Sequence, residues 1–210
     1  MTNYRLFFAT LLLAFLAGCS SMPENVARNA ELAKQGDADA QYQLGLAYTN
    51  GYGVKQDYAK AVNWFSQSAQ QGDADAQFML GAAYASGRGI TQDLTQAYSW
   101  FDKAADQKQI SALYQKAEAL ANGRGVEKDV TQARKYYTLA AKAGHSDAQY
   151  ALGVLVLTGR GGYKDEILGN AWLLAASDNG NVGAGTLFAA TQERLSDAEL
   201  TRVRQLAKRL

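Results

Sequence analysis

Cysteine, histidine and proline each occur only once in this 210-residue chain. A single cysteine cannot form a disulfide within the chain, so side-chain packing has to stabilise the fold. One histidine and one cysteine are also too few for the HExxH and CxxC patterns of zinc sites. Because proline interrupts helices, its near absence favours a largely helical protein.

The chain also lacks an excess of charge of either sign. It carries 21 basic and 20 acidic side chains, a net charge of +1. A nearly neutral protein is poorly suited to holding a nucleic acid backbone by charge alone, so we expect no nucleic acid partner. The glycine turns lack the further glycine and preceding strand of a dinucleotide site, and no GKS or GKT follows them. The sequence therefore predicts no cofactor and no small-molecule substrate.

Catalytic and metal-binding motifs are incomplete. Residues 177–179 read SDN, but no SxxK or KTG accompanies them, although an acylating serine needs a nearby lysine. The one histidine, His145, falls in a turn between repeated segments. Paired aspartates at 37/39 and 73/75 could suggest calcium ligands, but they open predicted helices, where the helix dipole favours negative charge. We therefore expect a non-enzymatic protein without a metal site.

The chain does contain an internal repeat with a spacing of 36 residues. The stretch GDADAQYQLGLAYTNGYGVKQD begins at Gly36, and GDADAQFMLGAAYASGRGITQD begins at Gly72. Weaker copies begin at Lys108 and Gly144, and a half copy begins at Gly180. Fixed spacing of this length predicts a solenoid, in which each repeat buries its apolar face only by stacking on its neighbours.

Each copy reads as two helices joined by a glycine turn. In the first copy Ala40, Leu44 and Tyr48 advance by four residues, which places them on one face of a first helix, called helix A. Gly51 suits the left-handed position that ends a helix. Asp57 can accept hydrogen bonds from the first amides of the second helix, called helix B.

The recurring pattern AxxxLGxxYxxGxGVxxDxxxAxxWxxxAA resembles the Sel1-like repeat, a relative of the tetratricopeptide repeat. The resemblance implies an all-α, right-handed superhelical solenoid of antiparallel helix pairs, with helix A on the concave side. It covers four repeats and implies a scaffold or adaptor, because the motif residues are structural. The repeats span 36–71, 72–107, 108–143 and 144–179.

The chain ends extend this array to about 11 helices. Residues 19–35 are expected to form a linker and an N-terminal capping helix, and residues 180–210 a half repeat followed by a C-terminal capping helix. Ser196 and Glu199 form a capping-box pattern at the start of the last helix.

The third copy departs from the pattern. Lys108 replaces the first glycine, and Lys116 replaces the leucine of helix A. A lysine at a packing position either extends its ammonium to water or marks a changed contact. We expect altered curvature and stability near residues 108–120.

The N-terminus reads as an export signal. Arg5 precedes an apolar run from Leu6 to Ala17, which is too short to span a membrane. Residues 16–19, LAGC, resemble the bacterial lipobox, which implies removal of residues 1–18 and acylation of Cys19. Ser20, in place of a retaining aspartate, implies the periplasmic face of the outer membrane. We expect the N-terminal lipid to hold the protein on that membrane.

A groove along the helix A row is the candidate binding surface. Side chains about half a turn from the buried face include an aromatic residue at every 36th position, and exposed aromatics are common at interfaces. The same aromatics could instead pack against the next helix A. The candidate groove residues are Tyr42, Leu46, Thr49, Phe78, Tyr114, Glu118, Tyr150 and Val154.

Two functions fit this sequence. The first is a lipid-anchored scaffold that binds another envelope protein or peptide on its concave surface. The alternative is an immunity protein that neutralises a phospholipase-type toxin delivered into the periplasm, because Sel1-like lipoproteins resemble some such inhibitors.

Overall fold

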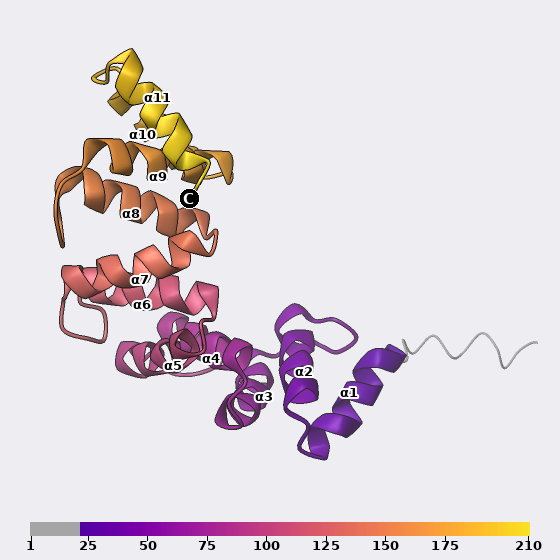
Figure 1. Cartoon of the computed structure of the whole chain (residues 1–210). Helices are drawn as coiled ribbons and strands as arrows, with labels where there is room; N and C mark the ends of the chain where they lie inside the picture. Colours follow the sequence, from indigo (N-terminus) through magenta and orange to yellow (C-terminus); the bar gives the residue numbers. More distant parts are fainter. Residues whose placement is uncertain (1–21) are drawn as a thin grey trace, which may run out of the picture.

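The computed structural model describes residues 22–210, which form 11 α-helices and no strands. From α1 to α10, consecutive helices pack on one another along a single curved row, and α11 packs on α9 (Figure 1). The sequence prediction of an all-helical solenoid is confirmed. The helices are α1 (Glu24–Lys34), α2 (Ala38–Asn50), α3 (Tyr58–Gln70), α4 (Ala74–Ser86), α5 (Leu94–Asp106), α6 (Ile110–Asn122), α7 (Val130–Lys142), α8 (Ser146–Thr158), α9 (Glu166–Asp178), α10 (Val182–Gln192) and α11 (Asp197–Ala207).

Helices α2, α4, α6 and α8 are the A helices of the four repeats, and α3, α5, α7 and α9 are the B helices. Each A helix ends at a glycine in the left-handed conformation, for example Gly51 with φ of 71°. Each B helix begins at an aspartate whose carboxylate accepts a backbone amide, as Asp57 does from Lys60. The capping box of Ser196 and Glu199 opens α11. These predicted helix boundaries are confirmed.

In repeats two to four, the second glycine of the turn lies against the backbone of the preceding repeat, whereas Gly53 in the first repeat lies against the side chain of Pro23. A Cβ atom on Gly89 would overlap the backbone of Tyr58, and one on Gly125 would overlap the backbone of Leu94. The turns of repeats two to four therefore lie against the start of the preceding B helix. Lys108, where other repeats have glycine, takes a left-handed φ of 64°, a conformation that costs a side-chain-bearing residue about 1–2 kcal/mol.

The buried core of residues 22–210 consists of clusters of alanine, leucine, valine and aromatic side chains between the helices. Phe65 on α3 packs with Ala76 and Leu80 of the next repeat, whereas the adjacent Trp64 packs with the cluster of α1 and α2. The pair of aromatics on helix B thus contacts the helices on both sides.

A row of buried glutamines on the A helices joins successive repeats. The Gln77 amide donates to the Ala69 carbonyl of the preceding B helix, 3.2 Å away, and its Oε1 accepts from Gln107, 2.9 Å away. Gln41 and Gln149 make the same two kinds of bond in their repeats. Buried amides need such partners, because an unpaired one costs about 1–3 kcal/mol.

Candidate functional site: a row of inter-repeat pockets

The predicted aromatic row lies against the B helices. The rings of Tyr42 and Phe65 are 6.0 Å apart, and those of Phe78 and Phe101 are 5.8 Å apart. Tyr114 likewise lies 6.0 Å from the ring of Tyr137. Each predicted residue is only partly exposed, because its ring packs on the B helix of its own repeat.

Two further apolar candidates on this face, Leu46 and Tyr150, are also packing residues. Leu46 packs against the cluster formed by α3 and α4. Tyr150 packs near Leu173, together with Leu157 and Phe188. These residues therefore expose only part of each side chain to a partner, because the rest is packed against neighbouring helices.

Three pockets open between successive A helices, and we call them inter-repeat pockets. The first lies between α2, α3 and α4, the second between α4, α5 and α6, and the third between α8, α9 and α10. Their volumes are about 120, 280 and 310 Å³. Each has the B helix as its floor and two A-type helices as its walls.

The residues that line the three pockets occupy equivalent repeat positions, separated by multiples of the 36-residue spacing. The pockets are thus three versions of one site generated by the repeat. The equivalent sets are Thr49, Ala85 and Leu157; Tyr58, Leu94 and Glu166; Val62, Tyr98 and Asn170; Met79, Gln115 and Leu187; and Ala83, Ala119 and Thr191.

The structure brings half of the predicted groove residues into these pockets. Thr49 lines the first, Tyr114 and Glu118 line the second, and Val154 lines the third. Tyr42, Leu46, Phe78 and Tyr150 are not among the residues that line them.

Sequence reasoning missed the contribution of helix B to these pockets. Val62, Tyr98 and Asn170 form the floors, one in each pocket. The signal that could have found them is the same 36-residue spacing, applied to both helices of the repeat rather than to helix A alone. At the junction of repeats three and four this position is Arg134, whose guanidinium donates to the carbonyl of Tyr163, 3.1 Å away.

Glu118 in the second pocket is held by its neighbours. Its carboxylate accepts a hydrogen bond from the Tyr137 hydroxyl and another from the Asn122 amide. Burial, followed by the charges of Glu118 and Asp147, raises the pKa of Tyr114 to about 12. Burial and the hydrogen bond to Glu118 raise the pKa of Tyr137 as well. Both phenols therefore remain protonated at neutral pH and can act as hydrogen-bond donors.

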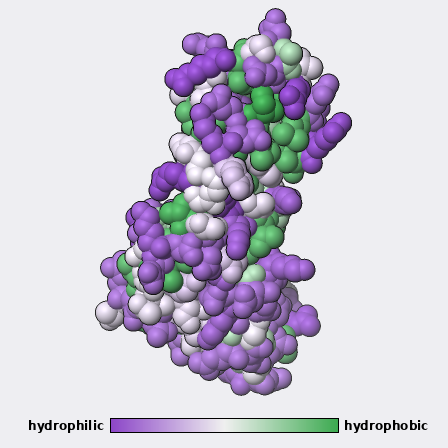
Figure 2. All heavy atoms as spheres, turned by 60° about the vertical axis from the view of Figure 1, so that its left-hand side comes forward, coloured by the Kyte–Doolittle hydropathy of each residue, from purple (hydrophilic) through white to green (hydrophobic). Residues whose placement is uncertain are grey.

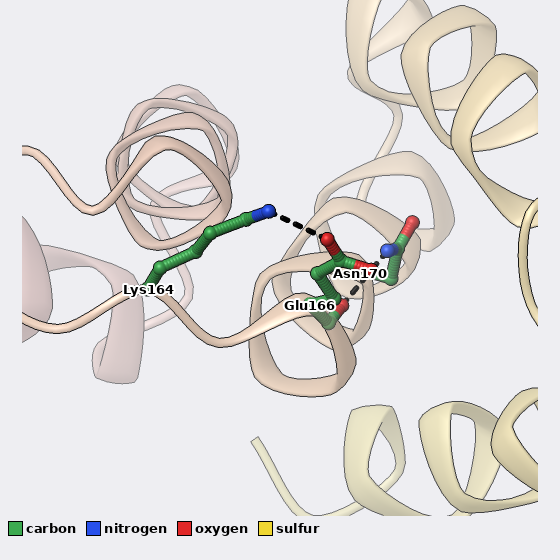
Figure 3. Close-up of polar contacts among 3 residues, drawn as sticks. All are labelled: Lys164, Glu166 and Asn170. Atoms are coloured by element: carbon green, nitrogen blue, oxygen red, sulfur yellow. Dashed lines mark hydrogen bonds and ion pairs between the residues drawn. The ribbon is translucent and has the colours of Figure 1, made fainter.

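The third pocket has an apolar wall and a charged rim. Figure 3 shows Lys164 reaching Glu166, with Nζ 2.6 Å from Oε1. The buried Asn170 amide donates to the backbone carbonyl of Glu166 at 2.8 Å. Hydrophobic residues also gather on the surface at the upper, C-terminal end of the molecule (Figure 2).

Lys116 is the one charged residue buried in the core of residues 22–210. Its ammonium pairs with Asp102 and lies 4.0 Å from the centroid of the Tyr136 ring. Burial lowers the pKa of Lys116, but hydrogen bonds to Asp102 and Tyr136 outweigh it, so the net pKa is raised. The lysine stays protonated, which makes it a structural cation and a poor nucleophile. Lys116 therefore does not extend its ammonium to water but makes a changed contact, with Asp102 and Tyr136.

His145 caps helix α8. Its ring accepts a hydrogen bond from the Ala148 amide at 3.3 Å, and it stacks on Tyr114 with ring centroids 4.5 Å apart. Aspartate, glutamine or asparagine makes the same cap at the start of the other A-type helices.

Within residues 22–210, no three His, Cys, Asp or Glu side chains lie close enough to hold a metal ion. No helix in this part of the chain has the length and hydropathy to cross a membrane. The predicted lipid attachment residue, Cys19, lies outside the described residues.

Comparisons with known proteins place the repeats in a family. The profile described as "Sel1 repeat" matches residues 38–73, 74–108, 110–145 and 146–181. A Sel1 repeat protein from Oxalobacter formigenes is 32% identical, with a TM-score of 0.74; the match covers 88% of this chain and 78% of that one. No curated protein matches the sequence.

Two further solved structures show the same fold. The c5321 protein, a protective antigen of uropathogenic Escherichia coli, is 27% identical with a TM-score of 0.58; the match covers 88% of this chain and 47% of that one. The immunity protein Pa5087 from Pseudomonas aeruginosa is 17% identical with a TM-score of 0.52; the match covers 88% of this chain and 72% of that one. The second likeness shows the fold alone.

Proposed function

Because this chain belongs to the Sel1 repeat family, we propose that it is a non-enzymatic scaffold that binds a partner protein along its inter-repeat pockets. Sel1 repeat proteins are scaffolds for protein interaction. The observation that carries the proposal is the recurrence of one pocket at three junctions of the array. Equivalent pockets along a row can accept successive side chains of one extended partner segment.

The proposal includes a location. The signal sequence and the LAGC motif support acylation of Cys19 and attachment to the periplasmic face of the outer membrane. An anchored scaffold would hold its partner close to that membrane. The partner is then an envelope protein or a peptide segment of one.

Photo-crosslinking in living cells tests the binding surface. A photoreactive amino acid is placed singly at Thr49, Gln115 and Thr158, one in each pocket. Matched controls carry it at exposed positions of the B helices, which also follow the 36-residue spacing. The control positions are Asn63, Ser99 and Lys135.

We expect the same partner to be captured from at least two pocket positions and not from the controls. Capture only from the B-helix positions would place the interface on the opposite side and overturn the surface assignment. Capture of a periplasm-delivered phospholipase, with growth rescue on co-expression, would instead favour the immunity alternative.

A further inference from the structure

The third pocket differs from the second in the character of its walls. Val154 and Leu157 on α8 face Leu187 on α10 across about 310 Å³. At the position of Leu187 the second pocket has Gln115. The volume is at the small end of the range of protein ligand sites, so it suits a group the size of an amino acid rather than a large molecule.

The polar groups at the floor of this pocket are already paired. The Asn170 amide donates to the Glu166 carbonyl at 2.8 Å, and its Oδ1 accepts from the Thr191 hydroxyl at 2.5 Å. Lys164 neutralises the Glu166 carboxylate at 2.6 Å (Figure 3). The floor therefore has no polar atom that requires a ligand.

Arg194, in contrast to Lys164 and Glu166, has no ionic partner at this pocket. It lines the same pocket, is exposed, and makes no ion pair within residues 22–210. The A helices of the four earlier repeats place short polar side chains at the equivalent position, namely Asn50, Ser86, Asn122 and Thr158. An unpaired guanidinium beside an apolar cavity is complementary to a carboxylate carried next to an apolar group.

We propose that the third pocket binds a leucine-sized side chain of the partner whose adjacent carboxylate pairs with Arg194. The apolar group enters between Val154, Leu157 and Leu187, and the carboxylate remains at the rim. With Lys164 paired to Glu166, Arg194 gives the pocket a net positive charge. This inference rests on the proposed scaffold function and names the chemistry of the segment that the C-terminal end of the array recognises.

The test uses N-acetyl-leucine as the probe and N-acetyl-leucinamide, which lacks the carboxylate, as its matched control. Both are titrated into isotope-labelled protein that comprises residues 19–210. Amide chemical shifts of Leu187, Thr191 and Leu157 are followed by NMR. The variants are Arg194→Gln and Arg202→Gln, the second removing an exposed arginine of α11 that does not line the pocket.

We expect saturable shifts with N-acetyl-leucine and an affinity at least fivefold weaker for the amide. Arg194→Gln should reduce the affinity for the acid to that for the amide, whereas Arg202→Gln should leave it unchanged. Equal binding of acid and amide, or no shifts with either probe, would overturn the proposal. Because crosslinking from the first and second pockets is independent of this titration, failure here is distinguishable from failure of the scaffold function.

Discussion

The ammonium of Lys116 on α6 pairs with the carboxylate of Asp102 on α5 from inside the packed stack of helices. Lys116 is 4% exposed, and the equivalent residue in the other repeats is Leu44, Leu80 or Leu152. The Asp102 side chain is 43% exposed. The pair therefore joins a buried cation to a largely hydrated anion, and its two ends differ in what their removal would cost.

Replacing the two ends of this pair should affect stability differently. Asp102→Asn leaves a buried ammonium without its main anionic partner, and we expect a loss of about 2 kcal/mol in the free energy of unfolding. Lys116→Leu restores the residue of the other repeats and leaves a carboxylate that water can solvate, so stability should be unchanged or increased. Urea denaturation of both variants measures these changes.

Asp106→Asn is the matched control, because this carboxylate is 4.0 Å from the Lys116 ammonium and 74% exposed. Its removal should change stability by less than about 0.5 kcal/mol. Equal losses for the Asp102 and Asp106 variants would show that the ion pair has no structural role.

The Gln77–Gln107 bond should behave as a coupled unit. Gln107→Ala leaves the buried Gln77 Oε1 without its donor, which should cost about 1–2 kcal/mol. In the third repeat both equivalent positions are apolar, Leu113 and Ala143. The double variant Gln77→Leu with Gln107→Ala copies that arrangement and should lose less stability than the two single variants together, by about 1 kcal/mol. Additive losses in the double-mutant cycle would contradict this coupling.

The His145 cap should make stability depend on pH. Burial lowers the pKa of His145 despite the opposing charge of Asp147. Because its pKa is lower in the folded state, the imidazole binds a proton more readily in the unfolded chain. The contribution of His145 to stability is therefore fully present above its unfolded-state pKa of 6.5 and is lost as the pH falls through its folded-state pKa. Protonation also removes the ring acceptor of the Ala148 amide. Between pH 7.5 and 5 we expect a loss of up to about 1 kcal/mol, the size of an N-cap bond.

His145→Asn provides the control for this measurement, because Asn181 caps α10 in the same way without titrating. The variant should keep its stability at pH 7.5 and show a smaller loss at pH 5. An identical pH profile in both proteins would assign the effect to other groups.

The proposed lipid anchor gives a cellular prediction. Cys19→Ser in the full chain removes the thiol to which the lipid would be joined. Labelled palmitate should be incorporated by the parent chain and not by the variant, and the variant should leave the membrane fraction. Ser20→Asp is a second variant, expected to keep the lipid and move the protein to the inner membrane. A parent chain without label would end the anchoring proposal.

The sequence by itself determined the repeat architecture. Helix lengths, the glycine turns and the aspartate caps depend on residues within one repeat, as with Gly51 and Asp57. Such local signals are readable because a cap joins residues only a few positions apart. The 36-residue copy then extended one repeat to the whole array.

Only the tertiary structure decided how the repeats meet. The Gln77 and Gln107 side chains are 30 residues apart in sequence, and Val154 and Leu187 meet across a pocket formed by three helices. Whether Lys116 reached water or a neighbouring carboxylate depended on Asp102, which lies in the preceding repeat. The relative rotation and spacing of stacked helices fix such contacts, and a pattern within a single helix contains no information about them.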